Sequence, residues 1–490
     1  MLFNSVVYWL FLPLVWVLYF CLPQRGRWVF LLLSSYVFYG FWKWEFAGLM
    51  ALTSVLDWAL VQAMIKQKRQ SFKKIFVALA LLTNIGLLFL FKYFDFALGS
   101  SELARQMYHS PYTAWIIELG KFTVPAGISF YTFQSISYVI DVYKGQEQPE
   151  PSLPKFMLFV AFFPQLVAGP IERFGRLHQQ LFAAYQPRWA ELRDGFRLLL
   201  YGLFLKVAVA DNLASVVDQF YAQPNHFDQG SAWVASFFFT FQVYTDFFGY
   251  SLLAQGSALL FGIRLMDNFQ KPFLAKSIPE FWHRWHISLS TWFRDYLFIP
   301  VGGNQRGPWV LALAVLLVFF TSGLWHGANS TMIVFGLAQG VLYLFDRFVF
   351  KRLAWESWIW DRVRQVKTGF FFMMTLVYFR SGSMDQAVQV FRGLMGRLSG
   401  RRYAAALDQA SRVQAQNQGE ILLQKLQIDL HIPLFLLVFW ILDHAIFKKR
   451  FDAWAESKSL LQRWGLYLFF IAAILIWGGA VNHPFVYFQF

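Results

Sequence analysis

Apolar runs of about 20 residues recur along this 490-residue chain and constrain its fold more than any other feature. A helix needs about 20 apolar residues to cross the hydrocarbon core of a bilayer, so runs of this length predict transmembrane helices. The runs are continuous, which excludes the alternating strands of an outer-membrane barrel. Composition agrees, because 57% of the residues are hydrophobic and only 14% are charged. The sequence therefore predicts an all-α polytopic membrane protein.

About twelve transmembrane helices are predicted, together with a re-entrant segment and interfacial helices, in a single integral-membrane domain over residues 1–490. The run 156–170 is too short to cross, contains Pro164 and ends in Ala168-Gly169-Pro170, a pattern that fits a re-entrant segment. The expected spans lie near residues 6–22, 28–43, 46–64, 76–98, 121–140, 196–222, 232–262, 309–326, 328–348, 366–380, 432–447 and 464–481.

Basic residues in short connections predict the orientation, because cytoplasmic loops retain lysine and arginine. Residues 66–74 carry five cations and no acid, and residues 351–367 make the same case near the other end. Both ends are then expected outside, the long 263–308 loop on the cytoplasmic side, and the hydrophilic 381–431 loop on the extracytoplasmic side. Residues 404–427 of that loop mix Ala and Leu with Gln and Arg, which predicts surface helices. The net charge of +15 follows from these loops, so no nucleic-acid partner is expected.

Two tracts of this apolar chain contain the histidines that are candidates for a functional site. One, residues 281–296, contains His286; the other places His326 before Gly327 and Ala328, between two long apolar runs. A histidine at membrane depth is by default a functional hypothesis. Neutral imidazole suits a general base, and the small residues after His326 let a substrate or backbone come close. The alternative for each histidine is a structural one, with its ring packed among neighbouring helices.

Other polar or aromatic residues in and near these tracts are candidates for contacting a substrate or for lining a tunnel through which it enters. Arg294 could pair with the phosphates of a donor or simply with a neighbouring acid. Asp246, like Asp57 and Lys206, is one of few charged residues in a predicted span. The candidates are Trp325, Asn329, Arg294, Tyr296, Asn304 and Asp246.

His283 and His286 would share one face of a continuous helix, where two histidines can form a metal pair. No acidic or cysteine partner has convincing ligand spacing, and we predict no metal site. The single cysteine, Cys21, excludes an intrachain disulfide.

These tracts resemble the signature of the membrane-bound O-acyltransferases, specifically the branch of bacterial alginate O-acetyltransferases. The resemblance runs nearly end to end and is weakest in 381–431. His283 stands where relatives usually have arginine, and Leu252 stands where they usually have aspartate. Further segments that resemble the branch lie at 124–134, 163–170, 267–269 and 484–490.

The resemblance implies that His326 is the active-site histidine and His286 the second polar residue of the site. It implies acetyl transfer from a cytoplasmic thioester, acetyl-CoA, toward O-acetylation of a secreted exopolysaccharide such as alginate or cellulose. No bound cofactor is implied. The implied location is the bacterial inner membrane, and the implied partners are membrane lipid, a periplasmic acetyltransferase and the polysaccharide machinery.

Three other functions stay open from the sequence. D-alanyl transfer to teichoic acid uses a related membrane fold but a carrier-protein thioester. A polysaccharide or ion transporter would use the buried charges of the spans as a pathway. A secretion scaffold would need no catalytic histidine.

Overall fold

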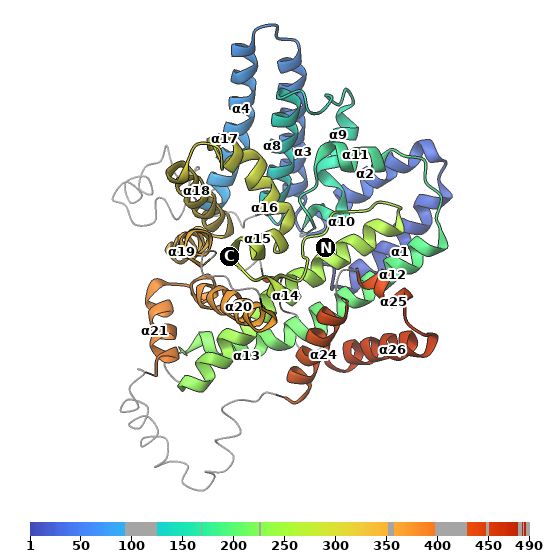
Figure 1. Cartoon of the computed structure of the whole chain (residues 1–490). Coiled ribbons are helices and arrows are strands. Elements are labelled where there is room, and N and C mark those ends of the chain that lie inside the picture. Colours follow the sequence, from blue (N-terminus) through green and yellow to red (C-terminus); the bar gives the residue numbers. More distant parts are fainter. Residues whose placement is uncertain are drawn as a thin grey trace, which may run out of the picture. The chain divides into compact units, whose positions relative to one another are not determined.

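The structure is a computed structural model that describes residues 1–93, 125–167, 169–224, 227–350, 357–396, 429–446, 450–478, 483 and 485–486 (Figure 1). Within these ranges the chain is helical and contains no strand. It divides into two compact units. The first comprises Met1–Gly202, Tyr250–Asn268 and His286–Pro300, and the second comprises Leu203–Gly249, Phe269–Trp285 and Val301–Phe490. A single domain over 1–490 stays a prediction.

The first unit is built mainly from the N-terminal helices. α3, α4 and α8 lie side by side in it, and α2 packs on α9 (Figure 1). Its elements are α1 (Val6–Cys21), α2 (Gln24–Gly40), α3 (Trp44–Ile65), α4 (Gln70–Leu88), η1 (Phe89–Tyr93), α8 (Ile128–Tyr143), α9 (Leu153–Ala161), α10 (Phe163–Leu166), α11 (Phe174–Leu181), nearly all of α12 (Trp189–Leu203), the end of α14 (Gln229–Leu260), α16 (Ile287–Phe293), η5 (Arg294–Phe298) and the start of α17 (Ile299–Val301).

The second unit holds the paired helices α18 and α19, against which α20 packs (Figure 1). A π-helical turn, η2, joins α12 to α13. Its elements are η2 (Phe204–Ala210), α13 (Asp211–Ala222), the first part of α14, η4 (Pro272–Leu274), α15 (Ile278–Arg284), α18 (Pro308–His326), α19 (Ser330–Phe348), α20 (Trp358–Arg380), α21 (Met384–Leu394), α24 (His431–Ala445), α25 (Phe451–Glu456) and α26 (Leu460–Trp477).

Six helical segments among the described residues are long and apolar enough to cross a membrane, so the predicted count of twelve is not confirmed. Two further apolar helices, α1 and α24, are shorter, with 16 and 15 residues. The predicted spans at 121–140 and 232–262 fall on α8 and α14, which bury polar side chains as well as apolar ones. The six segments are Trp44–Ile65, Gln70–Tyr93, Trp189–Ala222, Pro308–His326, Ser330–Phe348 and Leu460–Trp477.

The predicted re-entrant run, 156–170, folds as the end of α9 followed by the four-residue α10. Neither helix approaches the length that a span requires. The run is held close to the start of α8 at Gly127, whose φ is +78°. A Cβ there would lie 2.5 Å from the carbonyl oxygen of Leu166, so only glycine allows this approach.

The predicted 263–308 loop contains a succession of short helices, η4, α15, α16, η5 and α17. In the 381–431 loop the structure describes α21 and the residues around it. The surface helices predicted for 404–427 lie outside the described residues.

Candidate active site

His326 is the last residue of α18, and its side chain is buried. Its ring meets the ring of Phe379, near the end of α20, edge to face at a centroid distance of 5.2 Å. Trp325 and Phe335 pack on the same imidazole at 4.9 and 6.1 Å. Aromatic rings on several sides leave the imidazole few orientations, as a positioned base requires.

The crossing of α18 and α19 beside His326 depends on glycine. A Cβ at Gly323 would lie 2.3 Å from the carbonyl oxygen of Met332, and one at Gly336 would lie 2.2 Å from that of Phe319. Small residues let helix backbones approach closely in membrane proteins. The sequence places glycine where the helices meet, three residues before the histidine.

Asn329 holds the short connection that follows His326. Its side-chain oxygen caps α19 by accepting from the Thr331 N–H at 3.3 Å, and its amide donates to the Gly382 carbonyl at 2.9 Å. The Thr331 hydroxyl donates to the Ser381 carbonyl at 3.1 Å. These contacts tie the α18–α19 connection to the residues just after α20.

His286 lies in the first unit, between α15 and α16. Its φ and ψ of 44° and 54° are left-handed, a conformation that it shares with Lys271 among the described non-glycine residues. Such a conformation costs energy for a residue with a Cβ and concentrates at functional sites. The side chain is 1% exposed, and burial lowers the pKa of His286 to about 3. The imidazole is therefore neutral at physiological pH.

Asn268 fixes the backbone around His286. Its carbonyl accepts from the Ile287 N–H at 2.9 Å, and its side-chain oxygen accepts from the Ser288 hydroxyl at 2.6 Å. Its amide donates to the Ser251 hydroxyl at 3.1 Å. The sequence singles out Asn268 only as part of the segment 267–269 that resembles the family. Its contact with Ser288 could not be predicted, because a hydrogen bond between residues 20 positions apart leaves no periodic pattern in the sequence.

The prediction that His283 and His286 share one helical face is wrong. α15 ends at Arg284, and the left-handed His286 interrupts the helix before α16 begins. Residues 283 and 286 are therefore not one helical turn apart, and His283 is exposed. Within the described ranges, no group of three or more His, Cys, Asp or Glu side chains could hold a metal ion.

Arg294 and Tyr296 lie on η5, in the same unit as His286, and both have partners within the protein. The Arg294 Nε donates to Asp295 at 2.8 Å from an exposed side chain. The Tyr296 hydroxyl donates to Asp141 at 2.7 Å, and its ring packs on Trp292 at 5.1 Å. Both contacts supply a structural explanation for these residues, whose proposed contact with substrate stays a prediction.

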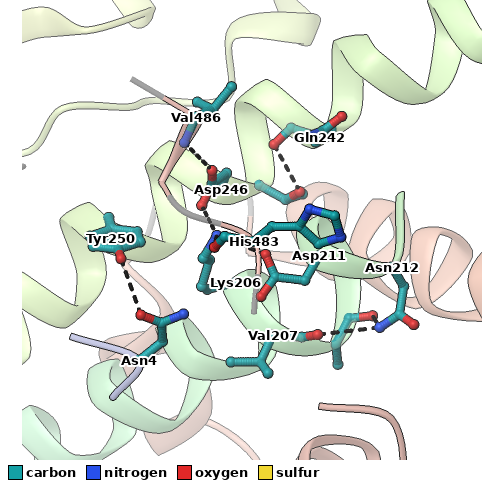
Figure 2. A network of polar contacts seen from close by, with 12 residues as sticks. Asn4, Lys206, Val207, Asp211, Asn212, Gln242, Asp246, Tyr250, His483 and Val486 are labelled. Carbon is teal, nitrogen blue, oxygen red and sulfur yellow. Dashed lines mark hydrogen bonds and ion pairs between the residues drawn. The ribbon is translucent and has the colours of Figure 1, made fainter. Parts of the chain in front are cut away.

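Asn304 and Asp246 lie in the second unit. The exposed Asn304 accepts a hydrogen bond from Arg347 at 3.2 Å. The buried Asp246 lies 2.9 Å from the Lys206 amine, and its other oxygen accepts from the Val486 N–H at 2.8 Å (Figure 2). Lys206 and Asp246, two of the buried charges that a transporter would use as a pathway, are thus paired with each other.

The structure brings His326, Trp325 and Asn329 together at one end of the α18–α19 pair. His286 is grouped with Asn268 in the other unit, so joint action of the two histidines stays a prediction. Phe379 was missed in the sequence, because one phenylalanine among 58 carries no signal.

Comparison with known proteins places these residues in a family context. The family model described as MBOAT, the membrane-bound O-acyltransferase family, matches residues 148–380. The probable alginate O-acetylase AlgI of Azotobacter vinelandii is 36% identical over 400 residues, covering 80% of this chain and 78% of the relative. The peptidoglycan O-acetyltransferase of Helicobacter pylori is 31% identical over 81% of this chain and 80% of its own length. The teichoic acid D-alanyltransferase of Bacillus subtilis is 28% identical over 52% of this chain and 68% of its own length.

Proposed function

The chain belongs to the membrane-bound O-acyltransferase family, and we propose that it moves an acetyl group from acetyl-CoA toward hydroxyl groups of a secreted exopolysaccharide. The observation that carries the proposal is the burial of His326 in an aromatic cage at the glycine crossing of α18 and α19. The family reaction needs a base at such a point, because the acceptor hydroxyl must lose a proton.

The similar proteins support acetyl as the group transferred. The two relatives described above that align over about four fifths of this chain are named for O-acetylation, one of alginate and one of peptidoglycan. The polymer differs while the reaction is the same. We therefore assign acetyl transfer with an extracytoplasmic carbohydrate as final acceptor, and propose an alginate-like or cellulose-like polymer.

The chemistry assigned to His326 is proton transfer in both directions. Its neutral imidazole takes the proton of the acceptor hydroxyl while that oxygen attacks the thioester carbonyl. The tetrahedral intermediate then collapses, the carbon–sulfur bond breaks, and the imidazolium returns the proton to the departing thiolate. General-base catalysis of this kind contributes about 10²- to 10⁴-fold.

His286 is assigned the second role on the sequence resemblance. Its burial keeps the ring neutral, so it retains a single N–H that can orient the base or polarise the thioester carbonyl.

We propose the bacterial inner membrane, with the donor thioester on the cytoplasmic side and membrane lipid around the apolar helices. A periplasmic acetyltransferase and the polysaccharide machinery are proposed to complete the modification. The immediate acceptor would then be either the polymer or a group on that partner.

The first experiment compares the O-acetyl content of secreted polysaccharide from cells with wild-type, His326→Ala or His283→Ala protein at matched membrane levels. His283 is the matched control, because it is an exposed histidine in the same signature tract. We expect O-acetyl loss of about 10²-fold or more with His326→Ala and wild-type content with His283→Ala. Retained acetylation in His326→Ala would return that residue to a packing role.

D-alanyl transfer is the second candidate, favoured by the similarity to the teichoic acid D-alanyltransferase. That similarity covers about half of this chain, against four fifths for the O-acetylases. The donors separate the two functions. Membrane vesicles that acetylate with acetyl-CoA alone support the acetyl assignment, whereas an absolute requirement for a charged carrier protein supports the other.

A further inference from the structure

A buried charge cluster lies in the second unit, around Lys206 (Figure 2). Lys206 is 1% exposed and lies in the π-helical turn η2. Its amine donates to Asp211 at 2.7 Å and lies 2.9 Å from Asp246 on α14. One lysine thus faces two carboxylates, and removal of either partner from a buried ion pair leaves a charge without compensation.

The cluster also binds the backbone of a segment more than 200 residues away in the sequence. Lys206 donates to the His483 carbonyl at 3.2 Å, and Asp246 accepts from the Val486 N–H at 2.8 Å (Figure 2). Phe485 is fully buried and meets the ring of Phe247 at 5.6 Å. We call His483, Phe485 and Val486 the anchored residues. Charged side chains therefore form hydrogen bonds with the backbone of the anchored residues. Leaving a buried backbone group without such a bond would cost stability.

A second set of contacts leads from the anchored residues to the candidate base. The His483 Nδ1 lies 3.4 Å from Asp218 on α13, and the other oxygen of Asp218 accepts from Arg380 at 2.6 Å. Arg380 is the last residue of α20. The residue before it, Phe379, packs on the His326 ring at 5.2 Å. The contact of the His483 ring with Asp218 and the ion pair of Asp218 with Arg380 therefore connect the anchored residues to the helix end that orients His326.

We propose that Lys206, Asp246, Asp218 and Arg380 are positioning residues, which lock the anchored residues against the end of α20 and thereby fix Phe379 on the His326 ring. The proposal rests on the catalytic role proposed for His326. None of these four residues needs to touch substrate. They act by limiting the orientations of the imidazole, and catalysis depends on such positioning because small displacements of a base are costly.

The anchoring itself is tested by thiol labelling of the full-length protein in detergent micelles. The exposed Cys21 is replaced by serine, and Val486→Cys then places a single thiol at a site that is 1% exposed. We expect slow reaction with a maleimide in this background. Adding Lys206→Met removes the amine that binds both carboxylates, and labelling should accelerate about tenfold or more, the factor that corresponds to about 1.4 kcal/mol.

Two further variants keep this test decisive if Lys206→Met folds poorly. Asp246→Leu deletes the acceptor of Val486 but leaves Lys206 and Asp211 as a pair of one charge each, and it should accelerate labelling as well. Val388→Cys, on the exposed face of α21, should react at the same rate in every background. Unchanged labelling of Val486→Cys in both Lys206→Met and Asp246→Leu overturns the proposal.

The link to catalysis is tested at Arg380 in membrane vesicles. Arg380→Met should lower kcat about tenfold with KM for the donor unchanged, and Arg380→Lys should restore most of the rate because it keeps the charge beside Asp218. Wild-type kcat in Arg380→Met overturns the positioning role. Labelling needs no catalysis, so it separates this proposal from the proposed function, whose failure would instead appear as unchanged acetylation in His326→Ala.

Discussion

A Cβ atom added to Gly323 on α18 would lie only 3.2 Å from the Cα of Gly336 on α19, so the two helices meet backbone to backbone. No side chain separates them at this point, which lies one helical turn from His326. The distance between the helices is therefore set by the absence of two side chains.

Gly323→Ala and Gly336→Ala are each expected to destabilise the protein by about 1–3 kcal/mol, the usual cost of overpacking. Both new methyl groups would collide with backbone carbonyls, which cannot rotate away. Gly340→Ala on α19 is the matched control, because its methyl group would meet side-chain atoms of Leu316 and Phe319 at 3.1 and 3.3 Å. Thermal unfolding in detergent should rank the control nearest to wild type, and equal stabilities for all three would contradict the close crossing.

Asn268→Ala is expected to reduce acetyl transfer by about tenfold, because it frees the backbone that holds His286 in its left-handed conformation. The change removes the acceptor of Ser288 and the donor to Ser251, and each such bond contributes about 1 kcal/mol. Ser251→Ala removes only the second bond and should retain more activity. Initial rates at matched protein levels test this order, and a greater loss in Ser251→Ala would disprove the assignment to Asn268.

Glu172, which lies outside the candidate spans, is expected to make the stability of the protein depend on pH. Burial raises the pKa of this carboxyl from its ordinary 4.5 to about 7. The hydrogen bond that Glu172 accepts from the Met266 N–H at 2.5 Å favours the charged form and opposes part of this rise. The folded state therefore binds the proton more tightly than the unfolded state. The stabilisation is complete below about pH 4.5 and is lost as the pH rises through about 7.

Glu172→Gln should remove this dependence, because glutamine keeps the acceptor for Met266 without a titrating proton. Melting temperatures measured from pH 5 to pH 8.5 should fall for wild type and change less for the variant. Parallel curves for the two proteins would show that Glu172 does not titrate in this range.

Tyr296→Phe separates a structural role from a role in substrate binding. Phenylalanine keeps the ring contact with Trp292 but loses the hydroxyl that donates to Asp141, so we expect a stability loss of about 1–2 kcal/mol. Acetyl transfer per folded molecule should stay near wild type if the hydroxyl serves only Asp141. A large fall in rate without a fall in stability would instead support the substrate contact predicted from the sequence.

The sequence predicts local features of the candidate site well and long-range ones poorly. The expected spans 309–326 and 328–348 match α18 and α19 to within two residues at each end, because unbroken apolar runs stop at the polar residues around Asn329. The geometry of His286 was not predictable. Its left-handed backbone depends on Asn268, which lies in a different local segment.

Lys206 and Asp246 illustrate the same limit in a predicted span. A charged residue in an apolar run predicts that the residue has a charged or polar partner, but the sequence does not identify that partner. The pairing of α14 with a π-helical turn and with residues near 485 is decided by tertiary packing. The count of about twelve spans stays a prediction, since α8 is 16 residues long in the structure and buries many polar side chains among its apolar ones.

Asn329 offers the most direct test of how the connection after His326 is held. Asn329→Asp keeps the side-chain oxygen that caps α19 but loses the amide that donates to Gly382, whereas Asn329→Ala loses both. An N-cap contributes about 0.5–2 kcal/mol, so alanine should cost more stability than aspartate. If the tie to Gly382 also orients His326, both variants should lose acetyl transfer. Ser330→Ala removes only the hydroxyl that donates to the Asn329 side-chain oxygen at 3.2 Å and leaves the tie to Gly382, so it should retain the rate. Rates and melting temperatures measured together separate the cap of α19 from the hydrogen bond to Gly382. A wild-type rate in Asn329→Asp would mean that Asn329 acts only as the cap.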